Sequence, residues 1–489
     1  MPRWLAGALV FVASGSVLVL EILAGRLLAP YVGVSLETYT GIIGVVLAGI
    51  ATGAWIGGWL ADRHDPRRLL PGALVGGGAL AITAVPLVRL FGSVGLGPSP
   101  PVIVFLAAVG FFLPSAILSA VTPLVVKIQL DSVAETGTVV GSLSAIGTAG
   151  SLVGVFVTGF VLVAAFPTTP VIIVVGGLLV VAGVTLWLRS GRRLPAQLVA
   201  GAVALAAASS GASVIADGPC QVETAYFCAR VEVDSERPTG RTLWLDTLRH
   251  SYIDLADPTY LELTYAQSMA DVIDSTAPPG EPLDAVHVGG GGFSLPRYLA
   301  AVRPGSRSLV LELDPSIVEL DEEQLGLVLD DDLRVVTGDA RNNLRNVATD
   351  SAALVIGDAF GGRSVPWHLT TREFVEDVDR VLRPDGVYAL NVIDQGALGF
   401  VRAEVATLRA VFDHVAIVGP PERLAATAGG NFILVASDAP IPAGAITRAS
   451  AARGDTDQVL ADPDGLEEFT GGADVLTDDH APVDQLLGP

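Results

Sequence analysis

A glycine turn and a downstream acid in the second half of the chain are spaced as in a nucleotide-type site. The turn Gly289, Gly290 and Gly291 follows an apolar run typical of a strand, and Glu312 ends the next such run. Glycines there let backbone N–H groups approach a ligand, and an acid about twenty residues on accepts hydrogen bonds from a ribose diol. This spacing predicts a nucleoside site; a glycine-rich turn without a ligand is the alternative.

Two aspartates are predicted to face the same crevice, because ligands of an open α/β sheet lie outside the carboxyl ends of its strands. Asp339 and Ala340 follow the third predicted strand, where Asp339 either meets a base edge or caps a loop. Asp358 ends the fourth strand and is the best candidate for chemistry. Its carboxylate could hold a cationic amine and accept the proton that the amine loses on attacking an electrophilic carbon. The alternative is a strand-end turn residue.

A doubly wound parallel sheet would position these residues. Helical intervals separate the predicted strands at 285–288, 308–313, 334–337, 352–356, 387–392, 414–418 and 432–436. This alternation predicts a parallel sheet with helices on both faces. Upstream, β-forming runs at 224–226, 230–233 and 242–245 predict a small antiparallel unit, and a helix over 258–273 and a Pro-rich linker at 278–280 follow.

The first half of the chain is apolar and is predicted to form a membrane bundle. A span needs about 20 apolar residues to cross the hydrocarbon core. Seven stretches meet this requirement, at 5–28, 39–60, 69–90, 102–126, 139–165, 171–188 and 197–216. The first is too long for a cleaved signal peptide. In the fourth, Pro114 and Pro123 are candidates for a helix break.

The basic residues predict the orientation of the bundle. Short loops that carry arginine or lysine alternate with loops around Gly95 and Thr168 that carry no charge, which makes the first group cytoplasmic. The basic loops contain Arg63, Arg67 and Arg68, then Lys127, then Arg189, Arg192 and Arg193. The N-terminus is then cytoplasmic too. The loop at 58–68 resembles the cytoplasmic loop between the second and third helices of major facilitator transporters.

Two cysteines bear on the location of the second half. Cys220 and Cys228 are the only cysteines, and they lie eight residues apart just beyond the seventh stretch. Such a pair predicts a disulfide in an oxidising compartment, and two unrelated buried thiols are the alternative. Seven spans would put the second half outside the cell. The alternative is that Gln197–Ala216, rich in alanine and glycine, lies in the bundle without spanning.

Two ionisable residues in the first stretch are candidates for a membrane site. Glu21 and Arg26 would be costly at membrane depth, so each is a functional candidate with the other as its expected partner. Snorkelling to the interface is the alternative. Glycine pairs such as Gly53 with Gly57 and Gly150 with Gly154 are expected at helix contacts. The bundle is therefore either a carrier or an anchor.

Charge separates the two halves. Residues 1–216 contain ten Lys/Arg and six Asp/Glu, a net +4, whereas residues 217–489 contain nineteen and forty-five, a net −26, which together give the −22 of the chain. An acidic surface of this kind repels nucleic acid, so no nucleic-acid partner is expected.

The stretch from about residue 223 to 437 resembles the spermidine synthase family of aminopropyltransferases. The resemblance rests on Glu223–Tyr226, Leu245-Asp246, Val288–Gly291, Leu311–Pro315, Gly338-Asp339, Asp358 and Leu369–Phe374. With Glu21, Arg26, Thr122-Pro123 and the terminal 476–484, the whole chain resembles prokaryotic membrane proteins that fuse such a domain to a transporter-like bundle. The resemblance implies decarboxylated S-adenosylmethionine as donor, a diamine such as putrescine as acceptor, and substrate contacts at Tyr226, His250 and Tyr260.

The departures from the family pattern lie on the acceptor side. Gly292 and Gly361 stand where the family has acids, His250 replaces a glutamine, and Leu261 replaces the histidine of a Tyr-His-Glu triplet. A doubly charged diamine needs paired anions, because desolvating an unpaired ammonium costs several kcal/mol. The nucleoside side of the site is retained, and the predicted acceptor is left open.

We therefore expect a multi-pass α-helical membrane domain followed by a Rossmann-like domain of the class I methyltransferase type. The expected domains are a bundle of six or seven helices at 1–216, a small antiparallel β unit and linking helix at 217–280, and the Rossmann-like domain at 281–489. The expected function is a membrane-bound aminopropyltransferase that uses an adenosyl-type donor, with Asp358 as base and no metal. A methyltransferase and a non-enzymatic transporter-like protein are the alternatives. Expected partners are membrane lipid and a small amine or nucleoside, and homo-oligomerisation stays open.

Overall fold

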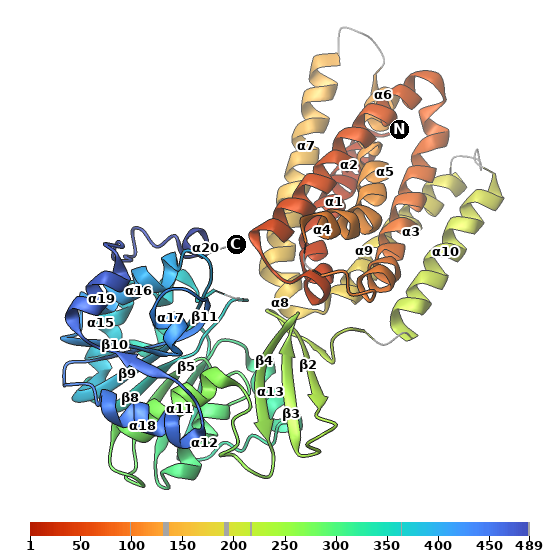
Figure 1. Cartoon of the computed structure of the whole chain (residues 1–489). Coiled ribbons are helices and arrows are strands. Elements are labelled where there is room, and N and C mark those ends of the chain that lie inside the picture. Colours follow the sequence, from red (N-terminus) through yellow and green to blue (C-terminus); the bar gives the residue numbers. More distant parts are fainter. Residues whose placement is uncertain (98, 131–135, 190–194, 216–217, 363, 488–489) are drawn as a thin grey trace. The chain divides into compact units, whose positions relative to one another are not determined.

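The computed structural model describes residues 1–97, 99–130, 136–189, 195–215, 218–362 and 364–487. Arg192, Arg193 and the expected domain boundary at 216/217 lie outside the described residues. The chain divides into two compact units, one of Met1–Arg230 with Leu245–Leu248 and the other of Val231–Trp244 with Arg249–Pro489. Figure 1 shows the elements of both.

The first unit is a helical bundle. Its helices are α1 Arg3–Val32, α2 Leu36–Arg63, α3 Pro66–Gly92, α4 Pro100–Ala107, α5 Leu113–Ser119, α6 Val121–Gln129, α7 Thr136–Val157, α8 Val163–Ala165, α9 Thr168–Arg189 and α10 Ala196–Ile215. Two π-helical turns, Ala108–Phe112 and Thr158–Leu162, continue α4 and α7. Counted over the described residues, seven helices are long and apolar enough to cross a membrane, with α4 to α6 forming one of them.

Local sequence explains the helix ends. The Ser35 hydroxyl accepts a hydrogen bond from Thr38 N at 3.1 Å, and Asp65 caps α3 by accepting from Arg67 N at 3.0 Å. Such side chains satisfy backbone N–H groups that have no partner in the first turn. The fourth predicted stretch is interrupted, because a π-turn precedes α5 and a break at Ala120 separates α5 from α6. Pro123 lacks the N–H that would bridge this break.

Glycines set the closest helix contacts in the bundle. A Cβ at Gly53 would lie 1.9 Å from the Ala116 carbonyl oxygen, and one at Gly150 would lie 2.2 Å from that of Phe11. The helix pairs α2–α5 and α1–α7 therefore approach to a distance that no side chain would permit. The predicted role of Gly53 and Gly150 in helix packing is confirmed.

The second unit contains an eight-stranded sheet in the order β12-β10-β11-β9-β8-β5-β6-β7. Its strands are β5 Asp284–Val288, β6 Arg307–Glu312, β7 Leu333–Thr337, β8 Ala352–Gly357, β9 Leu382–Asp394, β10 His414–Gly419, β11 Gly430–Ser437 and β12 Gln458–Leu460. All seven predicted strands are present. The sheet is mixed rather than wholly parallel, because β11 runs antiparallel to β9 and β10 and because β12 is antiparallel to β10.

Helices surround this sheet, as Figure 1 shows. They are α11 Thr264–Thr276, α12 Ser294–Val302, α13 Pro315–Gln324, α14 Ala340–Leu344, α15 Arg372–Val381, α16 Gly399–Arg409, α17 Pro421–Leu424, α18 Ala443–Arg453, α19 Pro463–Thr470 and α20 Val483–Leu486, with a 3₁₀ turn at Trp367–Leu369. The helix expected over 258–273 begins at Thr264, six residues later. The order β10-β11-β9-β8-β5-β6-β7, with β11 antiparallel to both of its neighbours, is that of a methyltransferase-like Rossmann fold.

A second sheet has four strands in the order β1-β2-β3-β4. They are β1 Val222–Glu223, β2 Cys228–Val233, β3 Gly240–Leu245 and β4 Leu248–Asp254. β1 and β2 pair antiparallel, with Glu223 opposite Cys228. The predicted β unit is present, with β4 as an additional strand and with 224–226 forming the turn between β1 and β2.

Candidate functional site

The carboxyl ends of four adjacent strands bring the predicted site residues together. Val288 of β5 pairs with Leu311 of β6 and with Gly357 of β8, and Glu312 pairs with Thr337 of β7. The glycine turn, Glu312, Asp339 and Asp358 each lie at or directly after these positions. In an open α/β sheet this edge is where ligands bind.

The glycine turn and Glu312 are joined directly. Glu312 Oε2 accepts hydrogen bonds from Gly290 N at 2.8 Å and Gly291 N at 3.2 Å, and Oε1 accepts from Asp314 N at 3.0 Å. Glu312 is 8% exposed, and burial raises its pKa while these backbone donors lower it. The carboxylate is thus held at the turn, where it can accept hydrogen bonds from a ligand's hydroxyl groups.

Glycine is required at the turn for steric reasons. Gly289 has φ +95°, and a Cβ there would lie 2.5 Å from the Asp358 carbonyl oxygen. At Gly292 a Cβ would lie 2.3 Å from Ile253 Cδ1 and 3.0 Å from Ser251 Cβ. An aspartate at Gly292, where the family has one, would therefore require the Ile253 side chain to move.

Asp358 is held by two neighbours that the sequence analysis did not identify. Asn391 Nδ2 donates to Asp358 Oδ1 at 2.9 Å, and the Tyr265 hydroxyl also donates to this carboxylate. Asn431 Nδ2 in turn donates to Asn391 Oδ1 at 3.0 Å. Burial raises the pKa of Asp358 to about 6, and the two donors limit the rise. A carboxyl with this pKa is mostly ionised at pH 7 and remains a usable base.

A narrow cavity lies beside Asp358. Its volume is about 10 Å³, close to the space that one water needs. The lining residues are His250, Ser251, His287, Gly289, Gly290, Gly291, Ser294, Leu295, Pro296, Ile356 and Asp358. Burial lowers the pKa of His250 to about 4 and that of His287 to about 3, so both imidazoles are neutral at pH 7. Asp358 is therefore the only charged residue among the described residues that line this cavity.

Asp339 and Ala340 begin α14, so the residue that could meet a base edge also caps a helix. Asp339 Oδ1 accepts from Asn342 N at 2.8 Å. Its other oxygen, Oδ2, lies 2.9 Å from Nε2 of His368, a residue that the sequence analysis did not identify. The side chain of Asp339 is 35% exposed, which leaves it accessible to a ligand.

The structure does not place Tyr260 in the cavity beside Asp358. Its hydroxyl donates to Glu262 Oε2 at 2.7 Å, and the Arg237 guanidinium stacks 3.7 Å from its ring centre. The tyrosine that reaches Asp358 is Tyr265, five residues later on α11. Tyr226 belongs to the first unit, with its ring 6.4 Å from that of Phe227, and its role in substrate binding stays a prediction.

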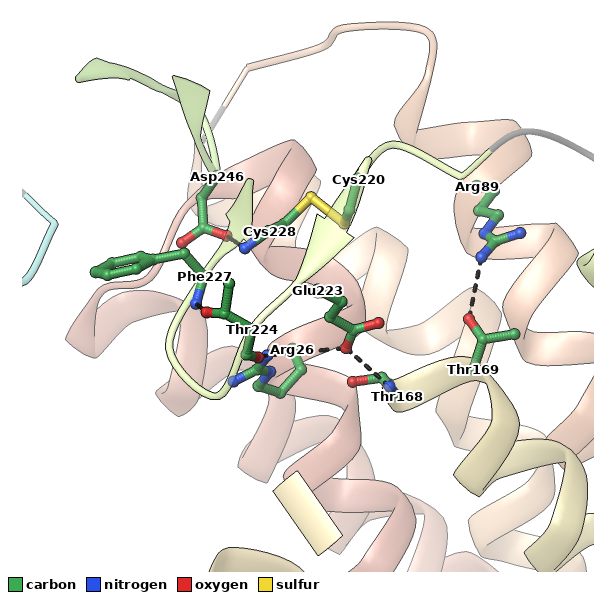
Figure 2. The surroundings of a disulfide bond; sticks show 10 residues. All are labelled: Arg26, Arg89, Thr168, Thr169, Cys220, Glu223, Thr224, Phe227, Cys228 and Asp246. Atoms are coloured by element: carbon green, nitrogen blue, oxygen red, sulfur yellow. Dashed lines mark hydrogen bonds and ion pairs between the residues drawn. A yellow bond between two sulfur atoms is a disulfide. The ribbon is translucent and has the colours of Figure 1, made fainter. Parts of the chain in front are cut away.

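The membrane candidates Glu21 and Arg26 do not pair with each other. Arg26 forms an ion pair with Glu223 at 3.8 Å and donates to the carbonyl oxygens of Thr224 and Ala225. Residues five apart on a helix point to different faces, which explains why Glu21 is not the partner. Figure 2 shows that Glu223 also accepts from Thr168 N at the start of α9, at 2.8 Å.

The predicted disulfide is present. Cys220 and Cys228 are bonded, with their Cα atoms 5.0 Å apart (Figure 2). Cys228 N donates to Asp246 Oδ1 at 3.0 Å. The disulfide loop, defined as residues 220–228, contains Glu223. Through this residue it contacts Arg26 and the start of α9.

Three residues near the site were not predicted from the sequence, and only one of them, Asn391, stands out in its sequence pattern. Asn391 is a single polar residue in the apolar run of β9 and is 1% exposed, and such a buried amide needs hydrogen-bond partners. Tyr265 and His368 lie in segments whose pattern gives no sign of their contacts.

No protein-family model matches this chain. A polyamine aminopropyltransferase from Vibrio vulnificus is 33% identical over 127 residues, which are 26% of this chain and 42% of that protein. A human eEF1A lysine and N-terminal methyltransferase is 28% identical over 142 residues, 27% of this chain and 20% of that protein. The chain thus spans less than half the length of these relatives.

A solved structure of a probable spermidine synthase from Corynebacterium glutamicum is similar as well. It is 30% identical, with a TM-score of 0.48, and the match covers 53% of this chain and 95% of that one. The aminopropyltransferase match and the strand order of the sheet support the spermidine synthase family for the Rossmann-like half of this chain.

Proposed function

We propose that this protein is a membrane-bound transferase that takes an adenosyl-type donor and passes its aminopropyl group to an amine, with Asp358 as the base. One observation carries the proposal: a buried carboxylate with a raised pKa lies at the strand end next to a glycine turn that is hydrogen-bonded to Glu312. The proposal assigns nucleoside binding and proton acceptance to these adjacent strand ends.

The reaction needs little beyond positioning and a base. The amine nitrogen attacks the carbon next to the donor's sulfonium sulfur, and the carbon–sulfur bond breaks with its electron pair going to sulfur. The products are an alkylated amine and a neutral thioether, so the leaving group needs no acid. Asp358 accepts the proton from the amine, with Asn391 and Tyr265 holding the carboxylate in place.

Methyl transfer is the second candidate function. The residues on the acceptor side of the site support it. The same attack on the methyl carbon of S-adenosylmethionine uses the same base and the same nucleoside contacts. The described residues that line the cavity beside Asp358 include no second carboxylate, and Gly292 stands where the family has an acid. An acceptor with one amine therefore suits this site better than a doubly charged diamine.

We place the Rossmann-like half outside the cell, after seven spans. Two observations support this placement. The disulfide of Cys220 and Cys228 is typical of an oxidising compartment. The disulfide loop also contacts Arg26 and the first residue of α9. Both lie at the end of the bundle whose loops, around Gly95 and Thr168, carry no charge, and the arginine pattern assigns this end to the outside.

An assay of the purified full chain tests the proposed chemistry. The protein is incubated with decarboxylated S-adenosylmethionine or S-adenosylmethionine and with a panel of monoamines and diamines, and products are identified by mass spectrometry. Methylthioadenosine from the first donor supports aminopropyl transfer, and S-adenosylhomocysteine from the second supports methyl transfer. Asp358→Asn should lower either rate about 10²- to 10⁴-fold. Failure to form either product and to bind either donor would leave the transporter-like alternative.

A further inference from the structure

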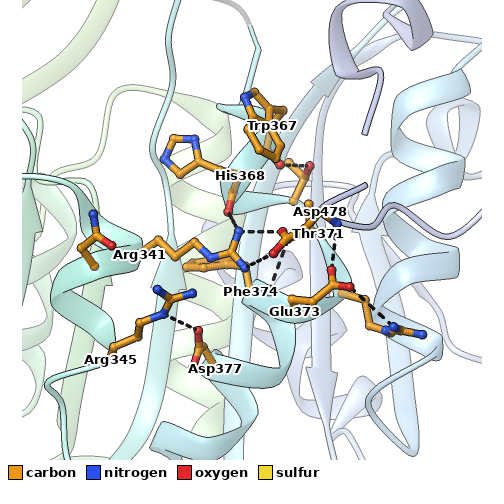
Figure 3. A network of polar contacts seen from close by, with 12 residues as sticks. Arg341, Arg345, Trp367, His368, Thr371, Glu373, Phe374, Asp377 and Asp478 are labelled. Carbon is orange, nitrogen blue, oxygen red and sulfur yellow. Dashed lines mark hydrogen bonds and ion pairs between the residues drawn. The ribbon is translucent and has the colours of Figure 1, made fainter. Parts of the chain in front are cut away.

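The C-terminal segment 476–480 packs against the two helices on the donor side of the site, α14 and α15 (Figure 3). Its central residue is Asp478. Asp478 Oδ1 and Oδ2 accept from Arg341 Nη1 and Nη2, each at 2.7 Å, and Oδ1 also accepts from the Thr371 hydroxyl at 2.7 Å. Asp478 N donates to Glu373 Oε2 at 3.0 Å.

Arg341 connects this segment to the donor site. Its side chain is only 10% exposed, and it follows Asp339 and Ala340 on α14. Besides both oxygens of Asp478, Nη1 donates to the His368 carbonyl oxygen at 3.3 Å. The His368 ring, in turn, lies 2.9 Å from Asp339 Oδ2. Arg341 is therefore connected to Asp339 in two ways, along the backbone of α14 and through the contacts of His368.

The short length of α14 makes these contacts important. The helix has only five residues, Ala340–Leu344, and a helix this short is not stable on its own. Its position depends on what holds it in the fold. A bidentate arginine–carboxylate pair fixes orientation as well as distance. The Arg341 hydrogen bond also lowers the pKa of Asp478, so the pair is charged at pH 7.

We propose that Asp478 is a positioning residue of the donor site, which holds Arg341 and, through it, sets Asp339 and His368 for the base end of the nucleoside. This inference rests on the proposed function, because it needs the site to bind a nucleoside. Asp478 itself touches no ligand and acts through Arg341.

The test is a calorimetric titration of the full chain with methylthioadenosine. Asp478→Asn keeps the shape of the side chain and removes its charge, and Asp478→Glu keeps the charge. Asp479→Asn, at the exposed next residue, is the matched control. We expect Asp478→Asn to weaken binding about fivefold to tenfold, with Asp478→Glu partly restored and Asp479→Asn unchanged.

A second readout separates positioning from folding. The acceptor KM of Asp478→Asn should stay within about twofold of wild type, since the acceptor contacts lie at Asp358. Thermal unfolding fixes a temperature at which all variants are folded. Unchanged nucleoside affinity in folded Asp478→Asn would overturn the positioning role alone. Absence of binding by the wild-type chain would overturn the proposed function, and this role with it.

Discussion

At the scale of single residues, the site combines a buried carboxylate with neutral neighbours. Among the described residues that line its cavity, Asp358 is the one that is charged, and it is held by Asn391 and Tyr265. Burial without a cationic partner makes the ionised form unfavourable, which is why its pKa rises. The raised pKa costs folding stability, and in the proposed function it leaves a base that works near neutral pH.

The raised pKa of Asp358 predicts how the folding stability of the Asp358→Asn variant depends on pH. The pKa of Asp358 rises from 3.8 to about 6 on folding, so ionisation opposes folding. Relative to the variant, the wild type should therefore lose stability as pH rises from about 4 to about 6. Above pH 6 the variant should be more stable by up to about 3 kcal/mol, because each pKa unit corresponds to about 1.4 kcal/mol. Denaturant unfolding at pH 4 and pH 7.5 measures this, and an equal difference at both pH values would contradict it.

Gly292→Ala tests the steric account of the glycine turn. The new Cβ would meet Ile253 Cδ1 at 2.3 Å, so the variant should lose about 1–3 kcal/mol of unfolding free energy from overpacking. Ile253→Ala removes the atom in conflict, and in the double variant the added cost of the Gly292 substitution should shrink. Thermal unfolding of the two single variants and of the double variant gives the coupling free energy between the substitutions at Gly292 and Ile253. Strictly additive losses would contradict the predicted clash.

At the scale of elements, the sequence predicted which segments form strands but not how all of them pair. The seven strands of the large sheet are visible as short apolar runs, and the crevice follows from their parallel carboxyl ends. The reversal of β11 is not visible, because an antiparallel strand has the same apolar pattern as a parallel one. The contact of His368 with Asp339 depends on how the segment between β8 and α15 folds back, which no local pattern encodes.

Helix contacts in the bundle give a matched pair of variants on α2. A Cβ at Gly53 would lie 1.9 Å from the Ala116 carbonyl oxygen, whereas one at Gly44 has no atom within 4 Å. Gly53→Ala should separate α2 from α5 and lower the unfolding temperature of the detergent-solubilised chain, at a cost of about 1–3 kcal/mol. Gly44→Ala should leave it unchanged or slightly higher. Equal effects of the two substitutions would refute close packing at Gly53.

At the scale of the whole molecule, a nearly neutral helical bundle is joined to a strongly acidic Rossmann-like half. Within the first unit, the disulfide loop contacts Arg26 of the bundle through Glu223. The resemblance of the whole chain to a fused protein anticipated this joining, whereas the pairing of Arg26 with Glu223 could not be predicted, because the two residues lie 197 positions apart in sequence.

Labelling of intact cells tests the orientation. A membrane-impermeant maleimide should label Cys220 and Cys228 only after reduction, since the two residues form a disulfide that the proposed orientation puts on the outer face. Lys127 is the only lysine in the sequence, and in the proposed orientation it lies at the cytoplasmic end, so it should react with an impermeant amine reagent only after lysis. Lys127→Arg identifies its signal against the N-terminal amine. Labelling of Lys127 in intact cells would reverse the proposed orientation.

The most direct test of the central claim, that the strand ends form a nucleoside site, is calorimetric titration of methylthioadenosine into the wild-type chain and into Glu312→Gln. The wild type should bind, and the variant should bind about 10- to 100-fold more weakly, because a charged acceptor for the ribose contributes about 1.5–3 kcal/mol. Binding that is absent in the wild type, or equal in both proteins, would contradict the account.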